Sequence, residues 1–509
     1  MPAKIQGQAK YEALLDTKHL QAGLKKRAIR GAGFTISAQT LNYGIQTIGT
    51  IILARLLTPE DFGMVAMVSA FSMLLQNFGG NGFTEAIVQR EDLTHHQMSK
   101  LFWTNLCIML GLSLAFMAMS PLLVWFYKEP QLKRISVAMS LSIFFGGLTT
   151  CHFALLSRNM KFHLTSMAQV SSGVLSTVLA VITATQGIGY WALVLRRITT
   201  PLLTATFVWI FCHWRPSIPT KSADIKPILR FGVRTYGNFL MDYFRKNSDK
   251  VIIGKFFGRT PLGHYDRATN LSSLLPNQLT AALSGVGVAT LSRLRGDPRK
   301  YLDYYAKSLS IQAFFAFPGS VLFTLLGKDI ILLLLGGQWT KAGDIFVALG
   351  PAIGLVVIYD TNIWLHLSLG RPDRLLRWSI SVLFLSVLSF FIGTIFGPIG
   401  VAIAYSTLFY VLLLPALYYA GRPLKIKASY FLSILWKYWF SAFSAGAICW
   451  TFLHILKPTS LALTGLAPLA KTICGASLYL IIYSCFIIIL FKGPKPFSLV
   501  FSTIKEIFR

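Results

Sequence analysis

Charged side chains are scarce in this chain, and acidic ones are the scarcest. Only 13% of the 509 residues are charged, 54% are hydrophobic, and the mean hydropathy is +0.58. Soluble domains carry about 25% charged residues, so this composition excludes a soluble fold and predicts a polytopic membrane protein. The 48 Lys and Arg outnumber the 19 Asp and Glu. Because most of these cations lie in short loops, they indicate membrane topology and contact with anionic lipid headgroups rather than nucleic-acid binding.

Sequence signatures of catalysis and of metal binding are missing. There is no D-x-D pair, no P-loop lysine motif and no Ser/His/Asp set at a plausible spacing. No loop is long enough for a soluble domain, which argues against a lipid-linked glycosyltransferase or ligase. The six cysteines form no C-x-x-C pair and lie inside or at the ends of apolar segments (Cys107, Cys151, Cys212, Cys449, Cys474, Cys485). We therefore predict that the protein is not an enzyme and has no cofactor, metal site or disulfide.

The histidines give no stronger indication of a metal site. His95 and His96 are adjacent, so they do not share a helical face, and we expect a solvated pair in a cytoplasmic connection. His152 and His366 fall within apolar segments, where polar contacts between helices are the usual role.

The apolar segments predict an all-α protein with about 14 transmembrane helices. The expected spans are roughly 33–56, 62–82, 101–126, 135–156, 164–185, 190–211, 231–256, 262–290, 306–326, 343–369, 378–396, 399–420, 438–456 and 468–491. An even number of spans returns the C-terminus to the starting side. The loops on that side hold about 31 Lys and Arg against about 8 opposite, which predicts that both termini are cytoplasmic.

Six parts follow from this order of segments. We predict a cytoplasmic N-terminal extension (1–30), an N-terminal six-helix bundle (31–212), a cytoplasmic linker (213–230), a C-terminal six-helix bundle (231–420), helices 13 and 14 (421–491) and a cytoplasmic tail (492–509). The extension is polar and too long before the first apolar run for a signal peptide. It ends in a cluster of cations, which holds a terminus in the cytoplasm.

An internal repeat relates the two predicted bundles. Residues 51–63 read IILARLLTPEDFG and residues 251–263 read VIIGKFFGRTPLG, so at an offset of 200 Arg55 meets Lys255 and Phe62-Gly63 meets Leu262-Gly263. Later, GIGYWALV at 187–194 is similar to GPIGVAIA at 397–404, at an offset near 210. Two matched turns at a near-constant offset predict two pseudo-symmetric bundles related by an axis along the membrane normal, with a cleft between them.

The seventh predicted span carries charges where a membrane helix should carry none. At 100° per residue, one arc of this helix holds Arg234, Asn238, Asp242, Arg245, Lys246, Asp249 and Lys250. Ionisable groups at membrane depth usually face a protein interior or a watery cavity. Four cations against two carboxylates predict the lining of a path for an anionic substrate. The alternative is an interfacial amphipathic helix, which would leave a segment of about 15 residues, too short to span at about 1.5 Å per residue.

Four motifs resemble those of the polysaccharide exporter and flippase family. They are ARLLTPEDFGMVA at 54–66, NSDKVIIGKFFG at 247–258, LGHYDRA at 262–268 and the L-L-G-G-Q-W-x-x-A run at 334–342. This family belongs to the multidrug, oligosaccharidyl-lipid and polysaccharide exporter superfamily, and the similarity is closest to its lipopolysaccharide and exopolysaccharide translocases, colanic-acid type included. The resemblance spans nearly the whole chain after about residue 30. It implies a bacterial inner-membrane protein with two six-helix bundles.

The resemblance further implies a transporter that moves an undecaprenyl-diphosphate-linked oligosaccharide from the cytoplasmic to the periplasmic leaflet by alternating access. Other polysaccharide assembly proteins and a coupling H⁺ or Na⁺ are further partners to consider. Two alternatives stay open: a cation-coupled multidrug exporter of the same superfamily, and a membrane-embedded glycosyltransferase or polymerase. A drug exporter would need an acidic, apolar pocket, and an enzyme would need large external loops with catalytic carboxylates.

Cations that can replace the water around a diphosphate are the predicted substrate-binding residues. These are Arg234, Arg245, Lys246 and Lys250 on the seventh span, with Arg55, Arg267 and Arg196 elsewhere; snorkelling to an interface is the alternative for Arg55 and for Arg197. Asp242 and Asp249 are predicted either to neutralise Arg245 and Lys246 or to bind a coupling ion. Asp360 has no cation within one helical turn, so it is the better coupling candidate.

Overall fold

Almost every residue that the structure describes is helical. The structure is a computed structural model that describes residues 24–80, 84, 87, 93–218, 226–455 and 467–507, and it contains no strand within these ranges. The chain divides into two compact units, Met1–Gly263 and His264–Arg509. The all-α class of the fold is thereby confirmed.

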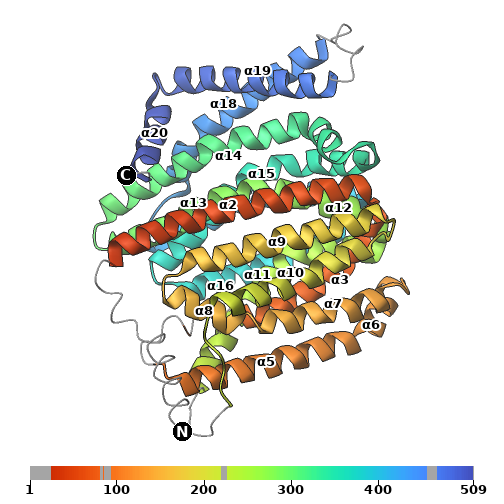
Figure 1. The fold of residues 1–509 in the computed structure, drawn as a ribbon. Coiled ribbons are helices and arrows are strands. Elements are labelled where there is room, and N and C mark those ends of the chain that lie inside the picture. The colour runs from red at the N-terminus through yellow and green to blue at the C-terminus, as the bar shows by residue number, and fades with distance from the viewer. Residues whose placement is uncertain are drawn as a thin grey trace. The chain divides into compact units, whose positions relative to one another are not determined.

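The described residues of the first unit form nine named helices and the first turn of a tenth (Figure 1). They are α2 (Leu24–Leu56), α3 (Pro59–Gly80), α5 (His95–Ala118), α6 (Ser120–Tyr127), α7 (Leu132–Gly147), α8 (Thr150–Arg158), α9 (Phe162–Thr185), α10 (Trp191–Phe211), α11 (Lys226–Phe257) and the start of α12 (Arg259–Ser272). The charged helix α11 packs against α3 and α6 in this unit. By these contacts α11 belongs to the first unit. The predicted bundle boundary at 213–230 stays a prediction.

The second unit holds the rest of the chain. It continues α12 and adds α13 (Leu274–Arg293), α14 (Pro298–Leu335), η2 (Gly337–Trp339), α15 (Thr340–Ser368), α16 (Pro372–Gly393), η3 (Thr394–Phe396), α17 (Gly397–Gly421), η4 (Arg422–Leu424), α18 (Ala428–Ile455), α19 (Ala467–Leu490) and α20 (Lys495–Ile507). Its core forms where α14 packs against α15, α18 and α19 and where α15 packs against α17.

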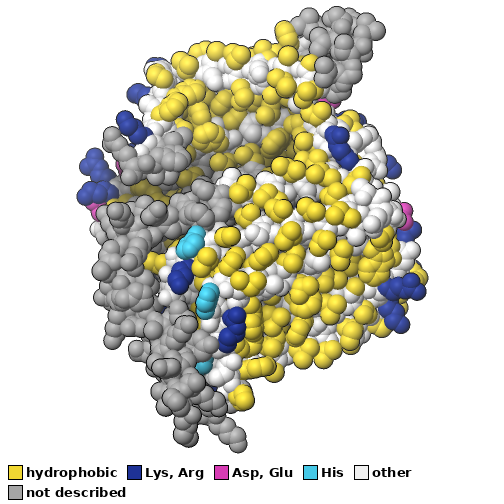
Figure 2. Space-filling model, viewed as in Figure 1, with side chains coloured by type: hydrophobic (Ala, Val, Ile, Leu, Met, Phe, Trp, Pro, Cys, Tyr) yellow, Lys and Arg dark blue, Asp and Glu magenta, His cyan; other side chains and the backbone are white. Residues whose placement is uncertain are grey.

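Eight segments among the described residues are long and apolar enough to cross a membrane. They are His95–Ala118, Leu132–Arg158, Phe162–Thr185, Trp191–Phe211, Pro298–Leu335, Gly337–Ser368, Pro372–Leu424 and Leu469–Leu490. The 53-residue stretch contains both α16 and α17. On the side drawn in Figure 2, hydrophobic side chains cover most of the described surface and Lys and Arg lie toward its edges, a pattern typical of a membrane protein. The number fourteen stays a prediction, partly because α11 is too charged to meet a criterion of apolarity.

Several predicted spans are broken or longer than expected. The span predicted at 101–126 consists of α5 and α6, the one at 135–156 of α7 and α8, and the one at 262–290 of α12 and α13. The break between α5 and α6 is followed by Pro121, which lacks the backbone N–H that a continuous helix needs. The break between α7 and α8 is preceded by Gly146-Gly147, and glycine pairs are a common cause of helix kinks. The predicted span 306–326 is only the middle of α14, which is 38 residues long.

The order of helices repeats along the chain, as the sequence motifs predicted. Corresponding helices begin at residues 59 and 259, 95 and 298, 162 and 372, and 191 and 397. Helix α2 has 33 residues and its counterpart α11 has 32. The arrangement of the two copies about a symmetry axis stays a prediction.

One turn has the same geometry in both copies. The helices before it end with a residue in the left-handed conformation, Met160 with φ 56° in the first copy and Gly370 with φ 66° in the second. The next amide, that of Lys161 or Arg371, donates to a carbonyl five residues back, at 2.9 and 2.8 Å respectively. Both are Schellman-type helix ends, so the backbone of the turn is conserved between the copies although the residues differ.

Helices 13 and 14 of the prediction correspond to α18 and α19, which pack on α14. Pro318 lies inside α14 and cannot donate a hydrogen bond to the carbonyl of Phe314. The hydroxyl of Tyr483 from α19 donates to that carbonyl at 3.1 Å. Tyr430 of α18 likewise donates to the carbonyl of Leu302 at 2.9 Å. These contacts fix both additional helices to α14 within the second unit.

Candidate functional site

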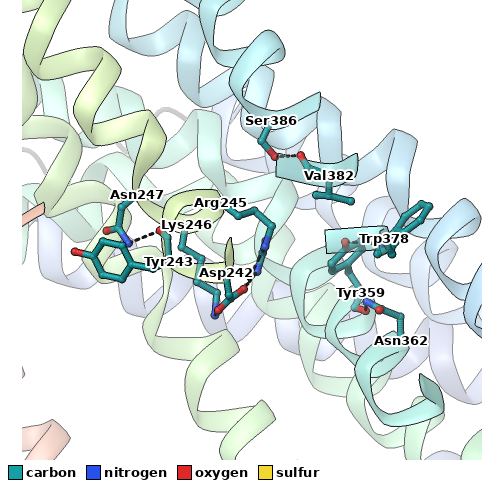
Figure 3. A network of polar contacts seen from close by, with 10 residues as sticks. All are labelled: Asp242, Tyr243, Arg245, Lys246, Asn247, Tyr359, Asn362, Trp378, Val382 and Ser386. Carbon is teal, nitrogen blue, oxygen red and sulfur yellow. Dashed lines mark hydrogen bonds and ion pairs between the residues drawn. The ribbon is translucent and has the colours of Figure 1, made fainter. Parts of the chain in front are cut away.

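The polar stretch of α11 is organised around one carboxylate. Asp242 accepts Arg245 at 2.8 Å and Lys246 at 2.9 Å, at i,i+3 and i,i+4 spacing on the same helix (Figure 3). The side chain of Arg245 is 12% exposed, whereas those of Asp242 and Lys246 are 45% and 58% exposed. One carboxylate of α11 therefore pairs with two cations of the same helix. Whether Asp242 only neutralises these cations or also binds a coupling ion stays a prediction.

Asp249 differs from Asp242 in its environment. It is 4% exposed, and its Oδ1 accepts the backbone amide of Lys250 at 2.8 Å. Ile252 and Ile253 are buried on the same helix. The backbone of Arg234 lies in α11, but its side chain lies outside the described residues. The cations whose side chains are described on the polar stretch are thus Arg245, Lys246 and Lys250.

Helix α3 connects α11 with α10. The hydroxyl of Tyr243 on α11 donates to the carbonyl of Ala70 at 2.8 Å, and Tyr243 is buried. Arg197 of α10 approaches the sulfur of Met73 at 3.7 Å, one turn further along α3. The first unit therefore brings the cations of α10 to the same helix that holds the polar stretch of α11.

Arg196 points to a different neighbour. Its Nη1 lies 3.4 Å from the hydroxyl of Thr50 on α2. Beside it, Thr200 donates to Ser176 at 2.8 Å, so hydroxyl groups follow the contact between α9 and α10. Pro201 also lies inside α10, and its backbone cannot donate a hydrogen bond because proline lacks an N–H. The guanidinium of Arg196 thus lies beside a hydroxyl group where α10 meets α2.

The remaining predicted site residues lie elsewhere. Arg55 is exposed in the last turn of α2. Arg267, on the part of α12 in the second unit, pairs with Asp266, and both side chains are largely buried. Asp360 is half-buried on α15, next to Tyr359, whose hydroxyl accepts Trp378 at 2.9 Å and whose carbonyl accepts Asn362 at 2.5 Å (Figure 3). The roles predicted for all of these residues stay predictions.

The expectation of a solvated histidine pair is wrong for His95. It is 3% exposed, and its Nδ1 accepts the indole N–H of Trp214 at 3.1 Å. His152 is fully buried and stacks on Trp209 with ring centroids 4.6 Å apart, and neither of its ring nitrogens finds a hydrogen-bond partner in the part of the chain that the structure describes. The segment after α10 carries Trp214 over α5, a long-range contact that covers His95. Among the described residues, no group of three or more His, Cys, Asp and Glu side chains is placed to hold a metal.

Sequence reasoning missed a cluster of charges where α11 meets α12. Arg259 pairs with Glu60 at 2.9 Å and with Glu129 at 3.3 Å. Lys255 donates to the carbonyl of Phe126 at 2.5 Å and lies over its ring at 4.6 Å. In the sequence analysis the TPED turn at 58–61 served only as a repeat motif. Its two acidic residues could have indicated that a cation from another segment packs against this turn.

The fold is that of a known class of membrane transporters. A solved structure of "Lipid II flippase MurJ, inward closed conformation" matches with a TM-score of 0.71, covering 90% of this chain and 100% of that chain at 16% identity. An inward-facing multidrug resistance transporter of the MATE family and MOP superfamily matches with a TM-score of 0.59, covering 77% of this chain and 99% of that one at 15% identity. At these identities the likeness shows the fold alone.

The family assignment comes from the sequence. A model of the family described as "Polysaccharide biosynthesis protein" matches residues 52–344, more than half of the chain, so the chain belongs to this family. The succinoglycan biosynthesis transport protein ExoT of Rhizobium meliloti is 26% identical over 358 residues, which cover 70% of this chain and 72% of that protein. The lipopolysaccharide biosynthesis protein WzxC of Escherichia coli is 21% identical over 390 residues, covering 75% and 78% respectively. The predicted family is confirmed.

Proposed function

We propose that this protein is a flippase that moves undecaprenyl-diphosphate-linked oligosaccharide units from the cytoplasmic to the periplasmic leaflet of a bacterial inner membrane. Its family is one of polysaccharide biosynthesis, two relatives are named for succinoglycan transport and lipopolysaccharide biosynthesis, and its fold is that of a lipid II flippase. The observation that carries the proposal to the residue level is the surplus of cations around Asp242 on α11.

The chemistry of the substrate explains why such a surplus is useful. A lipid diphosphate with a sugar head group cannot cross hydrocarbon unaided, because its charges and hydroxyls would lose their water. Arg245 can present several N–H donors to phosphate oxygens, and Lys246 supplies a compact charge beside it. Hydrogen bonds that involve a charged group contribute about 1.5–3 kcal/mol each. Two of them offset part of the lost hydration while the head group crosses.

Asp242 gives this site a resting state. Without substrate, its carboxylate occupies the donors of Arg245 and Lys246 and keeps two cations compensated at membrane depth. A diphosphate that enters competes with the carboxylate for the same donors. When it leaves, the ion pairs form again, so the cations need not trap their cargo. This exchange suits an alternating-access cycle, in which binding must be reversible on both sides.

The test is the double variant Arg245→Ala/Lys246→Ala in the full-length protein. We expect export of the polysaccharide to fall at least about tenfold, which corresponds to the loss of about 1.4 kcal/mol. Undecaprenyl-linked intermediates should accumulate on the cytoplasmic side, and drug resistance should stay unchanged.

A matched control comes from an exposed ion pair of the same i,i+4 type. Lys307 pairs with Asp303 at 2.9 Å, and the two side chains are 57% and 64% exposed. Because exposed pairs contribute little, Lys307→Ala should leave export at the parental level. Export that survives the double variant undiminished would exclude α11 as the binding helix, and a change in drug resistance would favour a drug exporter.

A further inference from the structure

Backbone of α3 lies against the corner between α11 and α12 at two glycines, Gly63 and Gly263. We call residues Lys255–Gly263 the α11–α12 corner. The chain turns here at Gly258, whose φ is +81°, and α12 then starts at Arg259. A Cβ on Gly63 would overlap the carbonyl oxygen of Arg259, and a Cβ on Gly263 would overlap that of Pro59. The first turn of α3 and the first turn of α12 thus touch backbone to backbone.

This contact is reciprocal under the sequence repeat. Gly63 corresponds to Gly263 and Pro59 corresponds to Arg259, each at an offset of 200. Residue i of one copy contacts residue j of the other, and j contacts i, which is the pattern of a two-fold interface. Only glycine permits this approach from both sides. Both copies of the repeat motif therefore contribute equivalent residues to this backbone contact.

Ion pairs at this corner involve Arg259 of α12 but not Pro59, its equivalent in α3, which has no charge. Arg259 reaches both Glu60 on α3 and Glu129 after α6, at 2.9 and 3.3 Å. Lys255 reaches the carbonyl of Phe126 in the last turn of α6, where a helix end favours a cation. The side chains of Arg259, Glu60 and Glu129 are 31%, 45% and 22% exposed. Ion pairs exposed to this degree are individually weak, so they can separate and form again.

We propose that Arg259 holds this end of the transporter closed, and that its release from Glu60 and Glu129 opens the way by which the substrate leaves. The inference rests on the proposed function. Helix α11 is the seventh span, so the predicted orientation places its C-terminal end on the periplasmic side. Arg259 acts through the two carboxylates rather than on the substrate, which makes it a positioning residue for the closed state.

Accessibility of Met67 reports the state of this corner. Met67 is fully buried on α3, one turn after Gly63, and its side chain would lie 3.5 Å from a Cβ placed on Gly254 of α11. Met67→Cys is introduced into full-length protein whose six cysteines are replaced and whose export is retained. Right-side-out spheroplasts are then treated with a membrane-impermeant maleimide. Parental protein should label slowly.

The decisive variant is Arg259→Ala, with Glu60→Gln/Glu129→Gln as a second route to the same loss of charge pairing. We expect both to raise the labelling rate several-fold, and Arg259→Lys to raise it less. Arg134→Ala removes an exposed cation from α7 and should leave labelling at the parental rate. Unchanged labelling in both the Arg259→Ala and the carboxylate variants would overturn the proposal.

The labelling requires no substrate, so it separates this inference from the proposed function. Arg245→Ala/Lys246→Ala is assayed for export, and Arg259→Ala for labelling. Faster labelling of Arg259→Ala supports the closure even where the export assay rejects the binding site. A third arm uses the pair Glu60→Cys/Arg259→Cys: oxidation to a disulfide should stop export and reduction should restore it. Export that continues through the oxidised pair would contradict opening at this corner.

Discussion

Helices α2 and α11 are the first helices of the two predicted repeats. They have nearly the same length but differ in charge at equivalent positions. Asn42 in α2 corresponds to Asp242, Ile45 to Arg245 and Gln46 to Lys246. Helix α2, which is uncharged at these three positions, packs by close approach: a Cβ on Gly49 would overlap Thr177 of α9. The charged copy places Asp249 at the position of Gly49 and pairs its cations with Asp242.

The tyrosines at equivalent positions show the same division. Tyr43 is 40% exposed on α2, whereas Tyr243 is 9% exposed and donates to the carbonyl of Ala70 on α3. The predicted duplication accounts for the similar lengths of α2 and α11, and the substitutions in α11 account for its charge. If these helices line the proposed substrate path, the anionic head group meets cations mainly on α11, so we expect binding to depend on α11 far more than on α2.

The largest effect should come from the feature that both copies share. Gly63→Ala and Gly263→Ala each place a methyl group onto a carbonyl oxygen of the opposing helix, and backbone cannot move aside as a flexible side chain can. We expect each variant to destabilise the closed resting state and thereby to lower the yield of folded, monodisperse protein. Detergent extraction followed by size-exclusion chromatography measures this loss.

Gly44→Ala is the control for that experiment. Gly44 lies on α2, and no atom of the described residues comes within 4 Å of the point where a Cβ on it would lie. Alanine should therefore be tolerated at this position and can add about 0.5–1 kcal/mol of helix stability. Equal recovery of Gly63→Ala, Gly263→Ala and Gly44→Ala would mean that the reciprocal contact is not needed for folding.

A smaller effect is expected where the copies differ, at Asp242. The variant Asp242→Asn gives α11 the residue that α2 has, while Arg245 and Lys246 remain. Their donors then no longer have the Asp242 carboxylate as a competitor, so the lipid diphosphate should be retained longer and export should slow by less than in Arg245→Ala/Lys246→Ala. Co-purified undecaprenyl-linked lipid, measured by mass spectrometry, should increase.

Asp242→Glu keeps the competing charge and serves as the comparison for this measurement. It should carry parental amounts of lipid. If Asp242→Asn also carries parental amounts while export falls, the carboxylate has another role, such as binding of a coupling ion.

Much of this architecture was predictable because it depends on local sequence. The period of apolar residues predicted helices, and the motifs at 51–63 and 251–263 predicted the repeat that the helix boundaries then show. The ion pairs of Asp242 were predictable because i,i+3 and i,i+4 neighbours always share a helical face.

Contacts between distant segments were not predictable in this way. Glu60 and Glu129 meet Arg259 across about 200 and 130 residues of chain, and nothing in the local pattern of either carboxylate specifies that partner. His95 was misjudged for the same reason, because its burial depends on Trp214. The hydroxyl of Tyr483 on α19 likewise donates to the carbonyl on α14 to which Pro318 cannot donate, and neither local sequence indicates this contact. A single sequence gives the faces of helices but not which faces meet.

The smallest effect should come from the turn that the copies share in backbone but not in residue. Met160 adopts φ 56° where the other copy has Gly370 at φ 66°. A residue with a Cβ loses about 1–2 kcal/mol in this conformation, whereas glycine does not. We therefore expect Met160→Gly to unfold at a higher temperature than Met160→Ala, because both lack the methionine side chain and differ only in the Cβ. Gly370→Ala should unfold at a lower temperature than the parent by a similar free energy of about 1 kcal/mol. Thermal unfolding in detergent, followed by tryptophan fluorescence, measures all three. If the alanine and glycine variants at 160 unfold together while Gly370→Ala is destabilised, the two turns are not equivalent in solution, and the repeat extends to the helices but not to their connections.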